Sequence, residues 1–145
     1  MRAASLGFAA GIGMGFFAVF FILWYVFQAI ADWKILSKAG KPGWHSFIPI
    51  LNVVSEYDIC WSGAMGLVFQ VAVALNTGLS QSESRIAAAI SAVFGIVAAV
   101  LHIVQSIKLS KAFGKGVGFG IFLILFGPLA RLVLGLGGSY YVGKQ

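Results

Sequence analysis

One arginine and three uncharged polar side chains interrupt the apolar runs of this sequence, and they are the first candidates for chemistry. Arg131 is the only charge clearly inside an apolar run. A central arginine costs at least about 2.5 kcal/mol on membrane-insertion scales, so its presence needs a reason. We expect it either to snorkel to the nearer surface or to bind a lipid phosphate, a backbone carbonyl or an acid of another chain. The acids Asp32, Glu56 and Asp58 are expected at the opposite membrane face, away from its depth.

His102 and Gln105 lie one helical turn apart and could share a site. As a proton relay they would need a carboxylate or a second histidine, and His45 is the only other histidine available. We therefore favour hydrogen bonds between helices for both side chains, and the same role for Gln70. Together with Arg131, these residues form the candidate intramembrane polar site.

The residue types that support catalysis or metal binding are scarce. The single cysteine, Cys60, excludes a disulfide or a cysteine metal cluster within one chain, and packing is its expected role. Two histidines and one cysteine in separate segments do not predict a metal site. Phosphate-loop, dinucleotide-binding, Gly-x-Ser-x-Gly and His-Glu-x-x-His motifs are absent from the sequence. We predict no catalytic residue, metal or cofactor, and hence no enzyme.

The composition indicates what positions these side chains. Of the 145 residues, 60% are hydrophobic and only 10% are charged, which is too little polar residue content to cover a soluble core. The net charge is +6, but the basic residues cluster at the ends of apolar runs. This pattern is typical of topology signals and anionic-lipid contacts, and it argues against a nucleic-acid site.

The apolar runs predict an all-α fold: an integral membrane four-helix bundle that occupies residues 1–145 as a single transmembrane domain. The spans are expected at about residues 8–30, 63–78, 86–107 and 117–136. The first is too long for a signal-peptide core, so we expect it to be retained. Between the first two spans, residues 44–58 predict an amphipathic helix at the membrane interface.

Basic residues beside the spans predict the orientation. Two lysine clusters, one after the first span and one after the third, outnumber the basic residues on the other face, so we expect the clusters in the cytoplasm and both termini outside. The clusters are Lys34, Lys38 and Lys41, then Lys108, Lys111 and Lys115, against Arg2, Arg85 and Lys144.

Small and polar residues recur at steps of three, four or seven within each span, which places them on one helical face. Gly7, Gly11 and Gly15 in the first span, and Gly95 in the third, are the predicted helix-packing positions. Such residues let helix backbones approach closely in a membrane. We favour a compact bundle; the alternative is that some of these faces line a polar cavity or a subunit contact.

The stretch KAGKPGWHSFIPILN at residues 38–52 resembles a family of small prokaryotic membrane proteins, domain of unknown function 5684. The stretches FGKG at 113–116, GF at 118–119 and GGSY at 137–140 also resemble it. The resemblance implies three or four membrane helices and no established activity. Some relatives carry the label signal peptidase I, which requires a nucleophilic serine and an activating lysine on a domain outside the membrane. We do not transfer that label, because this chain offers no such domain.

The shared motif also has a direct physical interpretation. We expect its Gly/Pro residues to turn the chain along the membrane surface, its tryptophan to anchor it, and Pro49 and Asn52 to fix the surface helix. The turn and anchor residues are Gly40, Pro42, Gly43 and Trp44. A cytoplasmic rim that could hold anionic headgroups or an acidic partner is predicted for Lys38, Lys41, Lys111 and Lys115.

These features favour a non-enzymatic scaffold or accessory subunit in the prokaryotic plasma membrane, working through helix and lipid contacts. Its expected partners are anionic lipids and either copies of itself or another membrane protein, with no nucleic acid. The alternative is a homo-oligomeric channel or transporter with Arg131, His102 and Gln70 facing a polar pathway. An enzyme acting on a lipid headgroup through His45 or His102 is the least favoured hypothesis.

Overall fold

The computed structural model describes residues 2–145, and over this range the chain is all-α, with no β-strand. One 3-10 helix accompanies six α-helices. The elements are α1 (Arg2–Lys38), η1 (Gly43–Phe47), α2 (Pro49–Cys60), α3 (Gly63–Ser80), α4 (Arg85–Ala112), α5 (Val117–Leu125) and α6 (Gly127–Leu136).

Three of these helices, α1, α3 and α4, are long and apolar enough to cross a membrane. They contain 37, 18 and 28 residues. At 1.5 Å per residue, even the shortest approaches the thickness of the hydrocarbon layer, which is about 30 Å. The first three predicted spans are therefore confirmed as helices, and α1 and α4 extend beyond the predicted ends.

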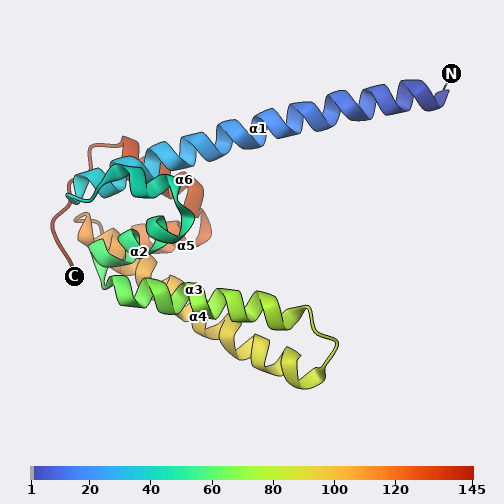
Figure 1. Cartoon of the computed structure of the whole chain (residues 1–145). Helices are drawn as coiled ribbons and strands as arrows, with labels where there is room; N and C mark the ends of the chain where they lie inside the picture. Colours follow the sequence, from blue (N-terminus) through green and yellow to red (C-terminus); the bar gives the residue numbers. More distant parts are fainter. Residues whose placement is uncertain (1) are drawn as a thin grey trace.

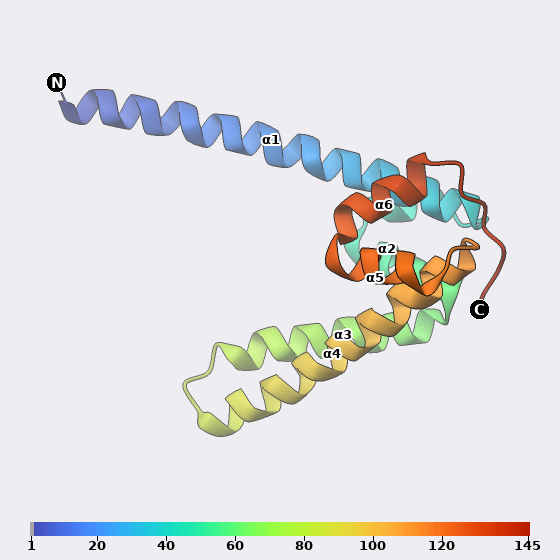
Figure 2. The same cartoon turned by 180° about the vertical axis from the view of Figure 1, so that it is seen from behind.

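The helices form a compact body from which two apolar arms project. In the body, α2 packs against α3 and α4, α1 packs against α6, and α5 contacts both α4 and α6. Figure 1 shows the N-terminal half of α1 as one arm and the α3–α4 hairpin as the other. Figure 2 shows from behind that α5 and α6, which are part of the body, lie between the two arms.

The fourth predicted span is not one helix but two short ones, so a four-helix bundle is not formed. α5 has nine residues and α6 has ten, and each is roughly half the length needed to span a bilayer. The break lies at Phe126, just before Gly127 and Pro128. Proline has no N–H to donate and its ring clashes with the preceding turn, while glycine is a poor helix former. The pair therefore turns the chain back on itself.

This reversal brings the C-terminus to the end of the molecule where α1 ends. Lys38 Nζ donates hydrogen bonds to the carbonyls of Leu134 and Gly137, each at 2.8 Å. Lys108 Nζ donates to the Gln145 carbonyl at 2.6 Å. The C-terminus therefore lies beside both lysine clusters, whereas the N-terminus lies at the far end of α1 (Figure 1). The prediction that both termini face away from the lysines is wrong for the C-terminus.

Both lysine-rich turns end their helices in the same way. Gly40 and Gly114 have φ angles of 75° and 69°, the left-handed region that glycine adopts most easily. Lys41 N donates to the Leu36 carbonyl, and Lys115 N donates to the Ser110 carbonyl, both at 2.9 Å. This is the Schellman arrangement, in which a glycine closes the last helical turn. It explains why α1 and α4 stop where the basic residues begin.

The helix predicted at the membrane interface exists, but half of it is buried. Pro49 occupies the first turn of α2, where its missing N–H costs nothing. From Ser55 onward α2 lies in the body, and Glu56 is only 2% exposed. The predicted amphipathic helix at 44–58 is thus divided into η1 and α2, and the second half of α2, with Ser55 and Glu56, packs against other helices.

The core lies at the end of the body where α1 and α4 stop in their lysine-rich turns, which we call the lysine end. Here α1, α2, α4, α5 and α6 meet. Its buried side chains are Ile35, Leu36, Ile59, Cys60, Leu109, Ala112, Phe113, Leu123, Ala130 and Leu134. Close helix approach depends on two glycines in particular. A Cβ added to Gly135 would collide with the Ala31 carbonyl oxygen, and one added to Gly95 would lie 2.8 Å from Asn76 Nδ2.

Candidate functional site

Arg131 lies at the centre of a buried charge cluster formed by three helices. Its Nη1 atom is 2.8 Å from Glu56 Oε1 of α2 and 3.5 Å from Asp32 Oδ1 of α1. The two acid side chains are 3% and 7% exposed, and the arginine side chain is 26% exposed. The expectation that Arg131 lies far from every acid of its own chain is therefore wrong.

The geometry distinguishes the two carboxyl groups. Asn52 of α2 donates a hydrogen bond of 2.9 Å from its amide to Asp32 Oδ2, while Arg131 donates to the other oxygen. Both oxygens of Asp32 are thus stabilised as acceptors. Glu56 Oε1 contacts Arg131 only as an ion pair, without an aligned hydrogen bond. Hydrogen bonds to a carboxylate favour its charged form, and Asp32 accepts one at each oxygen whereas Glu56 Oε1 accepts none among the described residues.

The break between α5 and α6 builds this cluster. If residues 117–136 formed one helix, Arg131 would lie toward the membrane face opposite the lysines. Because the chain turns at Gly127 and Pro128, α6 instead runs back along α1. Arg131 then reaches Asp32, which lies less than two turns before the end of α1.

A cavity of about 450 Å³ lies against the exposed side of Arg131. Its polar lining comes from Gln28 and Asp32 of α1, His102 of α4 and Arg131 itself. The remaining wall is formed by the end of α5 and the start of α6, at Leu123, Ile124, Leu125, Gly127 and Pro128. Gln28 Nε2 has no hydrogen-bond partner among the described residues. The cavity therefore offers donors and an acid next to a buried ion pair.

Of the predicted polar residues, the structure brings His102 and Arg131 to this cavity but not Gln70 or Gln105. The His102 ring stacks on Phe69, with ring centroids 6.3 Å apart. Gln70 donates to the Ile50 carbonyl at 3.1 Å and so ties α3 to α2. Gln105 is 2% exposed and faces the interior without a partner for its amide nitrogen among the described residues.

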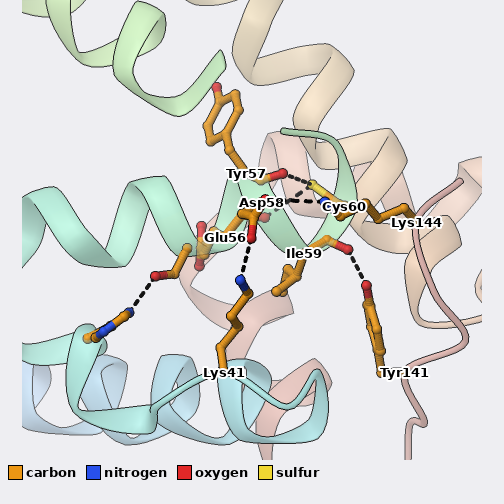
Figure 3. Close-up of polar contacts among 10 residues, drawn as sticks. Lys41, Glu56, Tyr57, Asp58, Ile59, Cys60, Tyr141 and Lys144 are labelled. Carbon is orange, nitrogen blue, oxygen red and sulfur yellow. Dashed lines mark hydrogen bonds and ion pairs between the residues drawn. The ribbon is translucent and has the colours of Figure 1, made fainter. Parts of the chain in front are cut away.

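A second cluster of charged side chains lies at the lysine end of the body (Figure 3). Asp58 of α2 forms ion pairs with Lys41 and with Lys144, the latter at 3.2 Å. The hydrogen bond from Lys41 is the main reason that the pKa of Asp58 is lowered. Tyr141 donates a hydrogen bond of 2.6 Å to the Ile59 carbonyl. The C-terminal residues are thus bound to α2 by both charge and hydrogen bonds.

The lysines of the predicted rim therefore fall into two pairs, one that binds polar groups of the chain and one that does not do so among residues 2–145. Lys38 and Lys41 bind groups of the chain itself, as described above. Lys115 Nζ lies 4.8 Å from the centre of the Phe119 ring, and Lys111 is exposed. Lys115 nevertheless lies close enough to Lys38 to interact with it electrostatically. Positive charge thus gathers at this end, though Lys41 is already neutralised.

The residues of the Gly/Pro motif have packing and turn roles. Gly40 provides the left-handed turn, and Pro42 precedes η1. A Cβ on Gly43 would collide with the indole of Trp33. Trp44 is 51% exposed, as an interfacial anchor would be.

Three of the four glycines predicted at helix contacts do not pack against another helix of the described chain. A Cβ added to Gly7, Gly11 or Gly15 would meet no atom of the described chain within 4 Å. These residues lie on the projecting arm of α1, and packing within the chain is the wrong prediction for them. Gly95, as described above, does pack against α3.

The sequence contains a signal for the cluster that is missed when the fourth apolar run is taken as one helix. The pair Gly127–Pro128 occurs in the middle of the fourth apolar run, where it favours a break. A break there moves Arg131 to the lysine face, where Asp32 and Glu56 are the unpaired acids. Asn52 gives no comparable signal, because its role depends on how α2 packs.

The model of a family of unknown function (DUF5684) matches residues 44–144. The chain belongs to this family. The matched region includes Glu56, Asp58 and Arg131, but the whole of α1, with Asp32, precedes it. No curated protein matches the chain, and no solved structure matches it. The family assignment agrees with the resemblance found in the sequence motifs and brings no known activity.

Proposed function

We propose that this chain is a non-enzymatic membrane protein of the prokaryotic plasma membrane that acts as a scaffold or accessory subunit. In this proposal the body and the α3–α4 arm hold the chain in the bilayer. The projecting half of α1 binds a transmembrane helix, either of another copy or of a different membrane protein. The exposed lysines at the body end contact anionic lipids.

The main support for the proposal is that the side chains of α1 before residue 20 are exposed. From Ala3 to Val19 every residue is exposed except Gly13, which is half-buried. Leu6, Phe8, Met14 and Phe16 are each at least 70% exposed. Such a surface suits lipid or another helix, and water would not favour it.

The glycines of this arm favour a helix as the occupant. A glycine inside a helix costs about 1 kcal/mol relative to alanine, and lipid contact alone gives no reason to accept that cost. Gly7, Gly11 and Gly15 recur every four residues and so share one face. Two helices can approach closely along such a face, with van der Waals contacts between their backbones.

The test compares two glycines on opposite sides of the arm. Gly11→Leu places a large side chain on the glycine face, while Gly13→Leu adds the same side chain two residues away, on the other side. A Cβ added at either glycine would meet no other part of the described chain within 4 Å, so neither change should disturb the body. The native mass of the mildly extracted complex, with every co-purifying chain identified, should fall for Gly11→Leu and stay at the wild-type value for Gly13→Leu. Equal masses for both variants and the wild type would refute the proposal.

The proposed orientation has the N-terminus outside and the lysine clusters in the cytoplasm, which follows from the excess of lysine at the body end. The C-terminus then lies in the cytoplasm as well, because it is bound to Asp58 and Lys108 at that end.

A channel or transporter is the second candidate, and the cavity beside Arg131 favours it. His102 and Gln28 line that cavity without taking part in ion pairs, so they can be changed without breaking the charge cluster. Gln70 lies elsewhere and is no longer part of the candidate pathway. Ion or solute flux into liposomes that is unchanged in the variant His102→Ala/Gln28→Ala would remove this candidate.

A further inference from the structure

The charge cluster contains one more acid than base. Asp32 and Glu56 are both at least 93% buried, and the ion pairs found for them among residues 2–145 involve Arg131 alone. If both acids were ionised, the cluster would carry a net charge of −1. An uncompensated charge in a buried site is strongly unfavourable, and the usual response is that one group becomes neutral.

The nearby basic side chains do not supply the missing positive charge. Lys38 binds the carbonyls at the end of α6, and Lys41 and Lys144 bind Asp58. His102 lines the same cavity as Arg131, so a positive charge on its ring would be repelled by the guanidinium. The missing charge must therefore come from solution.

We propose that the cluster is a proton-binding site, in which Glu56 binds and releases one proton around neutral pH and exchanges it through the cavity beside Arg131. This inference does not depend on the proposed role of the α1 arm.

Glu56, and not Asp32, is assigned the proton because of their different contacts. The groups that face Glu56 are Asp32 from α1 and Arg131 from α6, with Tyr57 and Cys60 as its titratable neighbours on α2 itself. Asp32 accepts hydrogen bonds at both oxygens, one of them from Asn52, which stabilises its charge. Burial raises the pKa of Glu56 to about 7, and the charge of Asp32 adds to this effect, while Arg131 opposes it.

The cavity provides the route for exchange. Arg131 is the part of the cluster that remains accessible, at 26% exposure, and Asp32, His102 and Gln28 lie on the same cavity wall. A proton can therefore pass between the cavity and the carboxyl pair through Asp32, which lines the cavity, without opening the body.

Infrared spectroscopy of the full chain in lipid nanodiscs tests the proposal, because the carbonyl stretch of a protonated carboxyl group is separate from that of a carboxylate. Between pH 5 and pH 9 the wild type should lose one such band with a midpoint near neutral pH. Glu56→Gln should lack this titration. Asp58→Asn should keep it, because Asp58 is an acid paired with lysines outside the cluster.

Asp32→Asn provides a second test that does not depend on the folding of Glu56→Gln. With Asp32 neutral, Glu56 and Arg131 balance each other, so the midpoint should move to lower pH by about one unit or more. A wild-type chain with no carboxyl titration above pH 5.5 would overturn the proposal. So would a midpoint that is the same in the wild type and in Asp32→Asn.

Discussion

Removal of the arginine from the charge cluster should be the most damaging single change in the body. In Arg131→Met the side chain keeps much of its apolar bulk, but two carboxyl groups that are 7% and 3% exposed lose the one cation that pairs with them among residues 2–145. Breaking a buried ion pair by removing one partner costs about 3–5 kcal/mol. A protein of this size has a total stability of about 5–15 kcal/mol, so we expect a large loss of folded protein.

The same reasoning predicts a rescue. Replacing all three ionisable groups, as Arg131→Met/Asp32→Asn/Glu56→Gln, leaves no unpaired charge in the cluster and should recover most of the lost stability. Arg85→Met is the matched control, because Arg85 is exposed at the start of α4 and should tolerate the change. Thermal unfolding in detergent, followed by tryptophan fluorescence, measures all four proteins. A triple variant as unstable as Arg131→Met, or a single variant as stable as Arg85→Met, would refute the pairing.

Three further changes test the packing of the body by thermal unfolding in detergent. Gly135→Ala should destabilise it by about 1–3 kcal/mol, because the new methyl group collides with a carbonyl of α1, whereas Gly138→Ala has open space and should be neutral. Equal effects of the two would contradict the close approach of α6 to α1. Tyr141→Phe should cost about 1 kcal/mol through its lost hydrogen bond, and Tyr140→Phe, at 81% exposure, should cost nothing. Asp58→Asn should remove the stabilisation that its lowered pKa implies, which is complete above its ordinary pKa of 3.8 and is lost at lower pH. The wild type should therefore exceed this variant in melting temperature at pH 7 and approach it below pH 3.8.

The long helices could be predicted from the sequence because each depends on local information. An apolar run of about 20 residues suffices to predict a span, and a lysine-rich glycine turn suffices to predict its end. For this reason the sequence predicts nearly the full extent of α3, and it predicts α1 and α4 except for the residues by which they extend past the predicted ends. A helix was also predicted at 44–58, where the structure has η1 and α2, but the burial of Glu56 was not predicted, because it requires a cation from a distant part of the chain.

The charge cluster could not be predicted until the fourth apolar run was divided. As one helix, that run places Arg131 far from Asp32; as two helices it places them in contact. The signal is only two residues long, Gly127 and Pro128, and membrane helices often tolerate such residues. The glycines of α1 posed the opposite problem, since their spacing indicates a helix contact without saying which chain provides the other helix.

The reversal between α5 and α6 is the central structural claim, and the side of the membrane on which the C-terminus lies tests it most directly. Cysteines introduced one at a time, as Ser82→Cys in the α3–α4 loop and Gln145→Cys, report their side through a membrane-impermeant thiol reagent. Cys60 should give little background, because it is buried and burial raises the pKa of its thiol to about 12. In intact cells Ser82→Cys should be labelled, whereas Gln145→Cys should be labelled only after the cells are made permeable. Labelling of both positions in intact cells would mean that residues 117–136 cross the membrane, and it would contradict the account.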